Sequence, residues 1–167
     1  MPAVNLNHVS LSEQLILLVE DNDEHALLIR RGLCKGTAIE SVQIVTSGEE
    51  AIEYLEGTGR YSHRDEFPLP SVVLLDLDLP GISGFDVLRW IRKQPILKTL
   101  WVVVITCSVL EQDVSLASIL GANSFIVKPR DLDSLIQMVE ASRSYWMGAD
   151  EVSLPVLPGR NAGAILE

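Results

Sequence analysis

The stretch "VVLLDLDLPG" (residues 72–81) joins four consecutive apolar residues to two aspartates and a turn. Apolar residues that follow one another without alternation are typical of a strand covered on both faces of a sheet. Pro80 and Gly81 then end the strand in a loop. Asp76 and Asp78 therefore lie where a buried strand meets solvent, and the question is which of them does chemistry, and of what kind.

Four further short apolar runs occur at residues 15–19, 42–45, 101–105 and 124–127. The run at 42–45 alternates a little, which predicts an edge strand, whereas the other runs indicate covered strands. Helical segments separate the runs, so the chain consists of five βα units. With right-handed crossovers, this order predicts a doubly wound α/β fold with a five-stranded parallel sheet and helices on both faces.

The helical segments carry recognisable start and stop signals. Ser47 with Glu50, and Ser108 with Glu111, form the S-x-x-E capping box, and Gly121 is a C-terminal stop. Three apolar stripes at helical spacing should pack on the sheet: Ala26, Ile29 and Leu33; Phe85, Leu88 and Ile91; and Leu132, Leu135, Ile136 and Val139.

At 167 residues and 47% hydrophobic, the chain is long enough for one well-buried domain. We assign this domain to residues 15–147, with an N-terminal tail at 1–14 and a C-terminal extension at 148–167. Residues 57–70 form a polar connection that is too long for a routine loop. Neither a signal peptide nor a membrane span fits the N-terminal sequence.

The net charge of −10 disfavours direct binding to nucleic acids or anionic membranes, and favours a protein partner. Cys34 and Cys107 lack metal-ligand spacing, which predicts two packed thiols in a reducing cytoplasm. His8, His25 and His63 also lack such spacing, so we expect them at surface or loop positions.

Polar side chains follow four of the predicted strands. Glu20 and Asp21 follow the first strand, Asp76 the third, Thr106 the fourth and Lys128 the fifth. Because ligands bind outside the carboxyl ends of parallel strands, this edge of the sheet is the predicted site. Two carboxylates about 4 Å apart repel by roughly 4 kcal/mol at an effective dielectric near 20, so the cluster requires a cation. Mg²⁺ suits such oxygen ligands and phosphoryl chemistry.

These residues resemble the receiver domain of two-component response regulators. The motifs that carry the resemblance are "LVEDN" (18–22), "LLDLDLPGISG" (74–84), "VITCS" (104–108) and "FIVKPR" (125–130). The spacing of Asp76, Thr106 and Lys128 is also usual for that family. The resemblance covers residues 15–147 and implies a flavodoxin-like sheet with strand order 2-1-3-4-5.

The resemblance also implies a role for each site residue. Asp76 would be the phosphoacceptor, in a protein that assists its own phosphorylation and dephosphorylation rather than acting as an enzyme on other substrates. Asp21 and Asp76 would bind Mg²⁺ together with the backbone carbonyl of Asp78. Glu20 would contact the ion mostly through water.

Three further roles follow from the same resemblance. Lys128 would pair with a phosphate oxygen or the acceptor carboxylate, and Thr106 would donate a hydrogen bond to the phosphoryl group. Phe125 takes the place of the switch aromatic, although it could simply be a half-buried strand residue. The bond from Lys128 to Pro129 would be cis, as is usual in the family.

Two residues depart from the commonest pattern of the family. Cys107 replaces a smaller residue after the threonine and could narrow access to the acyl phosphate. Asp78 occupies a variable position at the pocket mouth, and we hypothesise that its charge tunes the lifetime of phosphorylated Asp76.

Two other functions are alternatives to a phosphorylated switch. The "DLDLP" stretch approaches the D-x-D-x-[TV] motif of haloacid-dehalogenase-type phosphatases, but Pro80 replaces Thr or Val. In addition, no acidic pair follows a later strand, as such a phosphatase requires. A scaffold that keeps the fold without phosphorylation is disfavoured because the whole acidic pocket is intact.

We expect the output to be through protein contacts, because no second domain is recognised after Trp146. The single-domain form, the 57–70 loop, Tyr145 with Trp146, and the proline-bearing tail resemble regulators paired with phytochrome-type histidine kinases. Chemotaxis-type and phosphorelay regulators remain alternatives.

The tail is either disordered or an arm that supports a homodimer through Tyr145, Trp146 and four apolar residues: Val152, Leu154, Val156 and Leu157.

Overall fold

The computed structural model describes residues 15–35 and 42–147. The predicted tail at 1–14 and extension at 148–167 lie outside the described residues. The backbone of Tyr145 and Trp146 is described but their side chains are not, so their predicted role in an interface stays a prediction.

Five parallel strands form one sheet in the order β2-β1-β3-β4-β5, which confirms the predicted fold class and strand order. The strands are β1 (Ile16–Val19), β2 (Val42–Val45), β3 (Val72–Leu75), β4 (Trp101–Thr106) and β5 (Ser124–Val127). β2 is an edge strand, as its alternation predicted. β5 is the other edge, and only its Ile126 is buried, so the expectation of a covered strand is wrong for the run at 124–127.

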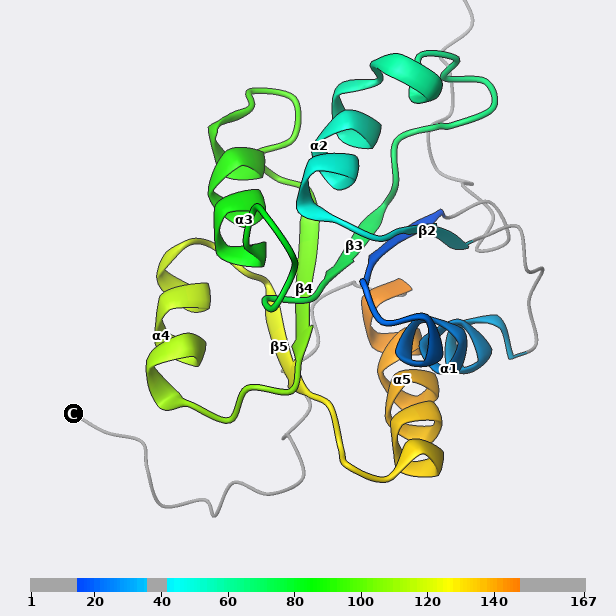
Figure 1. The fold of residues 1–167 in the computed structure, drawn as a ribbon, viewed down its shortest axis with the longest axis vertical. Coiled ribbons are helices and arrows are strands. Elements are labelled where there is room, and N and C mark those ends of the chain that lie inside the picture. The colour runs from blue at the N-terminus through cyan, green and yellow to red at the C-terminus, as the bar shows by residue number, and fades with distance from the viewer. Residues whose placement is uncertain (1–14, 36–41, 148–167) are drawn as a thin grey trace, which may run out of the picture.

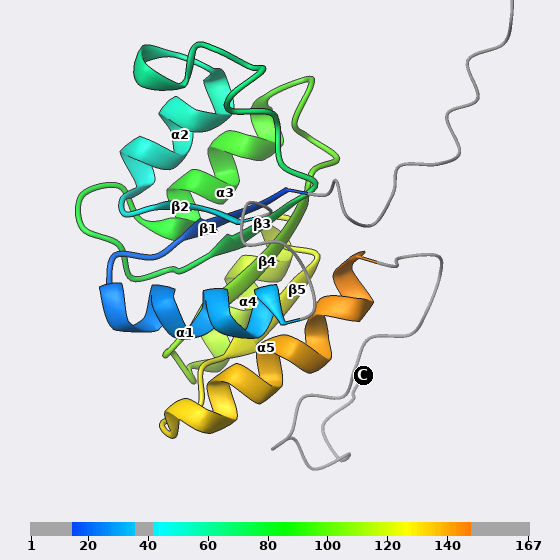
Figure 2. The same ribbon diagram turned by 90° about the vertical axis from the view of Figure 1, so that its right-hand side faces the viewer.

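Helices cover both faces of the sheet (Figure 1). On one face lie α1 (Asp23–Cys34) and α5 (Leu132–Met147); on the other lie α2 (Gly48–Glu56), α3 (Gly84–Lys93) and α4 (Glu111–Ile119). Figure 2 shows the sheet between α1 with α5 and α2 with α3. None of the helices in the described ranges is long and apolar enough to cross a membrane.

The core has two layers because successive strand residues point to opposite faces. In β1, Ile16 and Leu18 pack with α1 and α5, whereas Leu17 and Val19 pack with α2 and α3. Each such side chain contributes roughly 1.5–3 kcal/mol by leaving water. The predicted stripes supply most of the helical side: Ala26, Ile29, Leu33, Leu88, Ile91, Leu135 and Val139 are buried. Phe85 and Ile136 are partly buried and Leu132 is exposed.

Only the serine half of one predicted capping box is present, since the Glu50 carboxylate accepts the Thr46 N–H at 2.8 Å, and the other box is absent. The Ser47 hydroxyl accepts a hydrogen bond from the Glu50 N–H at 3.1 Å, as expected for an N-cap. Ser108 does not cap α4, which begins only at Glu111. Its hydroxyl donates to the Asp113 carboxylate and accepts the Leu110 N–H, so this pairing competes with the capping geometry.

The connection at residues 57–70 is more ordered and more buried than a polar loop. It includes a 3₁₀ turn, η3 (Gly59–Tyr61), in which Tyr61 is buried. The Tyr61 ring lies 4.9 Å from the Tyr54 ring and 5.0 Å from the Phe67 ring, between centroids. Arg64 donates to carbonyls at the end of α2, which ties the loop to that helix. The segment predicted as a polar connection therefore contributes Tyr61 and Phe67 to the core.

Candidate functional site

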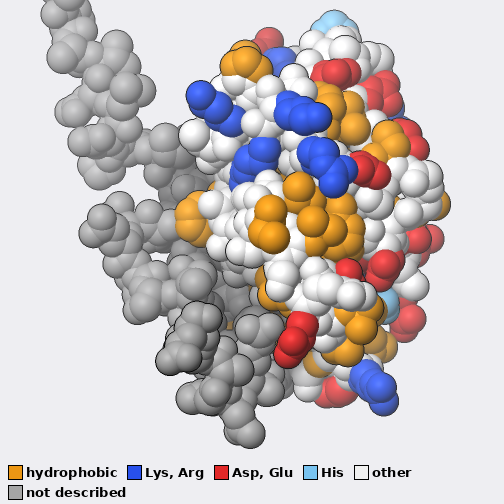
Figure 3. Space-filling view, turned by 90° about the vertical axis from the view of Figure 1, so that its left-hand side faces the viewer, with side chains coloured by type: hydrophobic (Ala, Val, Ile, Leu, Met, Phe, Trp, Pro, Cys, Tyr) orange, Lys and Arg blue, Asp and Glu red, His pale blue; other side chains and the backbone are white. Residues whose placement is uncertain are grey.

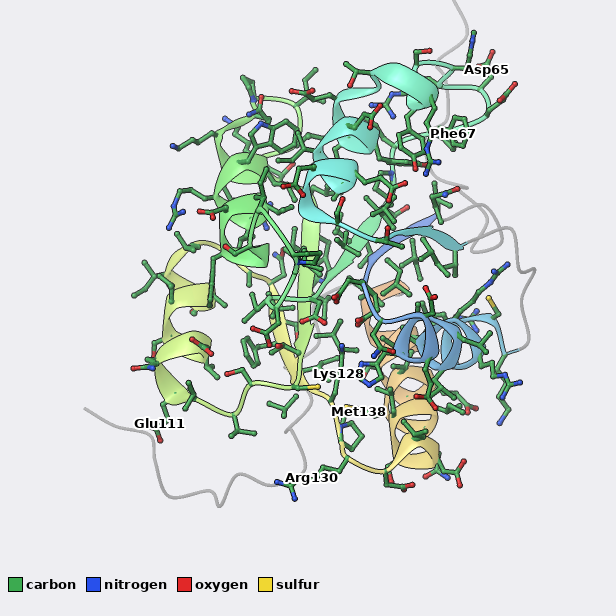
Figure 4. All side chains as sticks on the ribbon, viewed as in Figure 1. Asp65, Phe67, Glu111, Lys128, Arg130 and Met138 are labelled. Atoms are coloured by element: carbon green, nitrogen blue, oxygen red, sulfur yellow. The ribbon has the colours of Figure 1, made fainter. Side chains whose placement is uncertain are left out.

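Four polar or charged side chains are buried in the described part of the chain: Glu20, Asp76, Thr106 and Lys128. All four were predicted from the sequence as site residues at strand ends. Asp21 lies beside them and is exposed. Figure 4 labels Lys128 at the carboxyl end of β5, where side chains from several strand ends gather.

Strand register explains why these residues meet. Val19 of β1 pairs with Leu75 of β3, so Glu20 and Asp76 follow neighbouring strands at the same height. The Asp76 N–H continues this ladder by donating to the Val19 carbonyl at 3.1 Å. The Lys128 N–H likewise donates to the Thr106 carbonyl at 2.7 Å, which brings the end of β5 to the same edge.

The Lys128 ammonium lies at the centre of the cluster. Its Nζ donates to Glu20 Oε2 at 2.5 Å and to Asp76 Oδ2 at 2.8 Å. It also lies 3.3 Å from Nδ1 of His25, a residue of the first turn of α1. His25 was expected at a surface or loop position, and its contact with Lys128 was not predicted, because no local spacing links it to a lysine 103 residues away.

The carboxylates of Glu20, Asp21 and Asp76 could hold a metal ion. One oxygen from each lies within 4.8 Å of the others. All three donors are carboxylate oxygens, and Glu20 and Asp21 supply two of them from the turn after β1. Such hard donors suit Mg²⁺ better than a soft transition metal. The donor set therefore fits the predicted divalent cation.

The electrostatics of the site reflect an excess of negative charge. Burial raises the pKa of Glu20 to about 7, against the opposing effect of its hydrogen bond to Lys128, and the charge of Asp76 adds to the rise. Burial alone would lower the pKa of Lys128, but its hydrogen bonds to Asp76 and Glu20 raise it instead. The lysine thus stays charged, and its one ammonium is shared by the carboxylates of Glu20 and Asp76.

The backbone after β3 holds the Asp76 carboxylate in place. The Asp78 N–H donates to Asp76 Oδ1 at 3.1 Å, and the Asp78 side chain points into an exposed environment. Gly84 closes the loop by donating to the Leu77 carbonyl at 3.0 Å. A Cβ at position 84 would lie 2.1 Å from the Asp76 carbonyl oxygen, so only glycine fits there.

At the end of β4, the Thr106 hydroxyl is fully buried and accepts the Ser108 N–H at 3.3 Å. Phe125 is half-buried against Leu77, Val104 and Ala117. This position agrees with the plain interpretation of Phe125 as a strand aromatic. A switching role for it stays a prediction.

Two expectations about the carboxyl ends of the strands are wrong. The bond from Lys128 to Pro129 is trans, not cis. The trans form is intrinsically favoured by about 0.5–1 kcal/mol for an X–Pro bond, and Lys128 reaches both carboxylates with it. Cys107 is exposed rather than packed, because it follows the last residue of β4 on the solvent side.

The fold and this site define the class of protein. The chain matches the response regulator receiver domain over residues 16–140, and it belongs to that family. It is therefore a receiver domain of two-component signalling. The family match, with Asp76 on the third strand and only Thr106 and Lys128 at the later strand ends, leaves the phosphatase alternative without support.

Within this family, the chain is similar to particular response regulators of cyanobacteria. The chain is 36% identical over 142 residues to the response regulator Rcp1 of Synechocystis, covering 85% of this chain and 93% of Rcp1. It is similar in structure to the phosphorylated cyanobacterial phytochrome response regulator RcpA, with a TM-score of 0.75, 35% identity, and coverage of 87% of this chain and 99% of that one. The Mn²⁺-bound form of Rcp1 gives a TM-score of 0.73 at 34% identity, covering 86% and 99% of the two chains.

The raised pKa of Glu20 predicts an unusual pH dependence of stability without metal. Between pH 4.5 and about 7, the folded state keeps a proton on Glu20 that the unfolded chain has released. The free energy of unfolding should therefore fall as the pH rises through this window, by at most about 3 kcal/mol. Urea unfolding in EDTA at a series of pH values measures this, and added Mg²⁺ should restore stability above pH 7.

Glu20→Gln should flatten the metal-free dependence on pH, whereas Glu111→Gln on the exposed surface of α4 should leave it unchanged. An identical slope in the native protein and in Glu20→Gln would contradict this assignment.

Proposed function

We propose that Asp76 accepts a phosphoryl group from a histidine kinase. The observation that carries the proposal is the setting of its carboxylate, which is buried, bound by Lys128 on one oxygen and by the Asp78 N–H on the other, and adjacent to Glu20 and Asp21. Asp78 lacks such a setting because its side chain is exposed.

In the transfer, a carboxylate oxygen of Asp76 attacks the phosphorus of a phosphohistidine and forms the new O–P bond. The P–N bond breaks, and its electron pair stays on the imidazole of the donor, which takes up a proton. Asp21, Asp76 and the Asp78 carbonyl would hold Mg²⁺, with Glu20 contacting it mostly through water, and the bound ion would supply positive charge to the phosphoryl oxygens.

Side chains of the protein itself bind the phosphoryl group and respond to it. Lys128 exchanges its hydrogen bond to Asp76 for one to a phosphoryl oxygen. Thr106 turns its hydroxyl toward the phosphoryl group, and Phe125 moves inward into the space that this frees. Attack by water on the acyl phosphate then returns Asp76 to its free form, so the protein promotes its own phosphorylation and dephosphorylation. The exposed charge of Asp78 tunes the rate of that hydrolysis.

The signal leaves through a protein surface. Figure 3 shows hydrophobic side chains gathered on the face of α3 and α4, below a group of Lys and Arg side chains. Leu116 and Ile119 of α4 and Ile96 of the segment between α3 and β4 are exposed. Movement of Thr106 and Phe125 would alter the neighbouring surface of α4, β5 and α5.

A phytochrome-type histidine kinase is the proposed partner. The support is the similarity to a cyanobacterial phytochrome response regulator over nearly the whole of that chain. Chemotaxis-type and phosphorelay kinases are the alternatives. We further propose a cytoplasmic location, no direct binding to nucleic acid or membrane, and a homodimer formed through α5 and residues 148–167.

Incubation with acetyl phosphate and Mg²⁺ should add one phosphoryl group, and mapping should place it on Asp76. Asp76→Asn should take up none, because the amide is not a nucleophile for this transfer. Asp78→Asn should still be phosphorylated but should lose the group at a rate that differs several-fold from the native rate. Phosphate on Asp78, or uptake by Asp76→Asn, would refute the assignment.

Phosphotransfer tests the partner. A purified phytochrome-type kinase, autophosphorylated on its histidine, should pass label to this chain within minutes and in a light-dependent amount. A chemotaxis-type kinase serves as the comparison. Faster transfer from the chemotaxis-type kinase would reject the phytochrome assignment.

Removal of residues 148–167 tests the dimer. Sedimentation should show the full chain as a dimer and the shortened chain as a monomer. The shortened chain should still take a phosphoryl group from acetyl phosphate, since the described site ends at Lys128. An unchanged mass after truncation would count against the arm.

A further inference from the structure

His25 contacts the site from α1. It lies in the first turn of that helix, its side chain is 27% exposed, and its Nδ1 is 3.3 Å from Lys128 Nζ. The same nitrogen is 4.0 Å from Glu20 Oε1, which is too far for a hydrogen bond. The lysine is therefore the partner of the ring.

The turn between β1 and α1 fixes His25 relative to Glu20. Asn22 is the N-cap of α1, and its side-chain oxygen accepts the His25 N–H at 3.0 Å. The Asn22 N–H donates to Glu20 Oε1 at 3.1 Å. One short segment thus positions two of the groups that contact Lys128.

The hydrogen-bond donors of Lys128 determine which nitrogen of the His25 ring must act as acceptor. An ammonium has three N–H donors and no acceptor. Those donors face Glu20 Oε2, Asp76 Oδ2 and His25 Nδ1. For the third contact to be a hydrogen bond, Nδ1 must carry a lone pair, and the ring proton must lie on Nε2.

We propose that His25 is a positioning residue that orients the Lys128 ammonium for phosphoryl transfer. This inference rests on the proposed function of Asp76. Glu20 and His25 both belong to the β1–α1 segment, so two acceptors remain in place while the third N–H turns from Asp76 to the phosphoryl oxygen. Because the imidazole acceptor is neutral, it directs the lysine without adding a further negative charge to an acidic site.

Two substitutions separate this role from simple packing. His25→Asn keeps an acceptor oxygen close to the position of Nδ1, whereas His25→Leu removes the acceptor and keeps the bulk. His63→Asn, at an exposed position in the loop after α2, is the matched control. We expect His25→Leu to slow phosphorylation by acetyl phosphate about tenfold or more, as for loss of one hydrogen bond to a charged donor. We expect His25→Asn and His63→Asn to stay within about twofold of the native rate, because both keep that hydrogen bond.

A second measurement needs no phosphoryl transfer. Nitrogen-15 spectra of the metal-free protein above neutral pH should show His25 with its proton on Nε2, and His25→Leu should shift the Lys128 Nζ resonance. The affinity for Mg²⁺ should be the same in all variants, because His25 is not among the grouped carboxylates.

The outcomes are distinct. Equal rates in His25→Leu and the native protein, equal slowing in His25→Leu and His25→Asn, or a proton on Nδ1 would each overturn the positioning role. A native protein that takes no phosphoryl group on Asp76 would instead overturn the proposed function, and the spectra would still decide whether His25 contacts Lys128.

Discussion

The buried ion pair of Lys128 with Glu20 and Asp76 is the interaction on which the site depends. Each of these side chains would be costly to bury alone, since an unpaired buried charge destabilises a fold by several kcal/mol. Lys128 reduces that cost for both carboxylates at once through bonds of 2.5 and 2.8 Å. The balance is incomplete, as the raised pKa of Glu20 indicates. A divalent cation and a phosphoryl group change this charge balance directly, so the site is sensitive to both.

The sheet makes this pairing possible. Lys128 is 108 residues from Glu20 and 52 from Asp76 in the chain. In the order β2-β1-β3-β4-β5, β1 and β3 are neighbours and β4 with β5 follow, so the ends of four strands share one edge. The apolar cores on the two faces fix the strand register, because a shift by one residue would exchange the two layers. The packing of residues such as Leu17 and Leu18 therefore positions the polar groups at the strand ends.

Features that depend on local composition could be predicted from the sequence, and those that depend on distant contacts could not. The strand limits were correct within one residue, because each buried run stops where a polar residue begins. Ser47 follows the capping rule, but Ser108 matches the same pattern and binds Asp113 instead. The aromatic contacts of Tyr61 were hidden because the composition of residues 57–70 is mostly polar. The contact of His25 was missed because only the folded structure brings it to Lys128, 103 residues away in the chain.

The attachment of α4 suggests where a change at the site is transmitted most easily. Ala117 is the buried residue of this helix, and α4 begins without a side-chain cap. By contrast, α1 has the Asn22 cap and five buried residues, and α3 has the Ser83 cap and four. Few buried contacts mean a low free energy of local rearrangement. Thr106 ends β4 just before the segment that leads to α4, and Phe125 packs against Ala117. A movement of Thr106 toward phosphorylated Asp76 would thus be resisted least by α4, whose exposed Leu116 and Ile119 could carry that change to a partner.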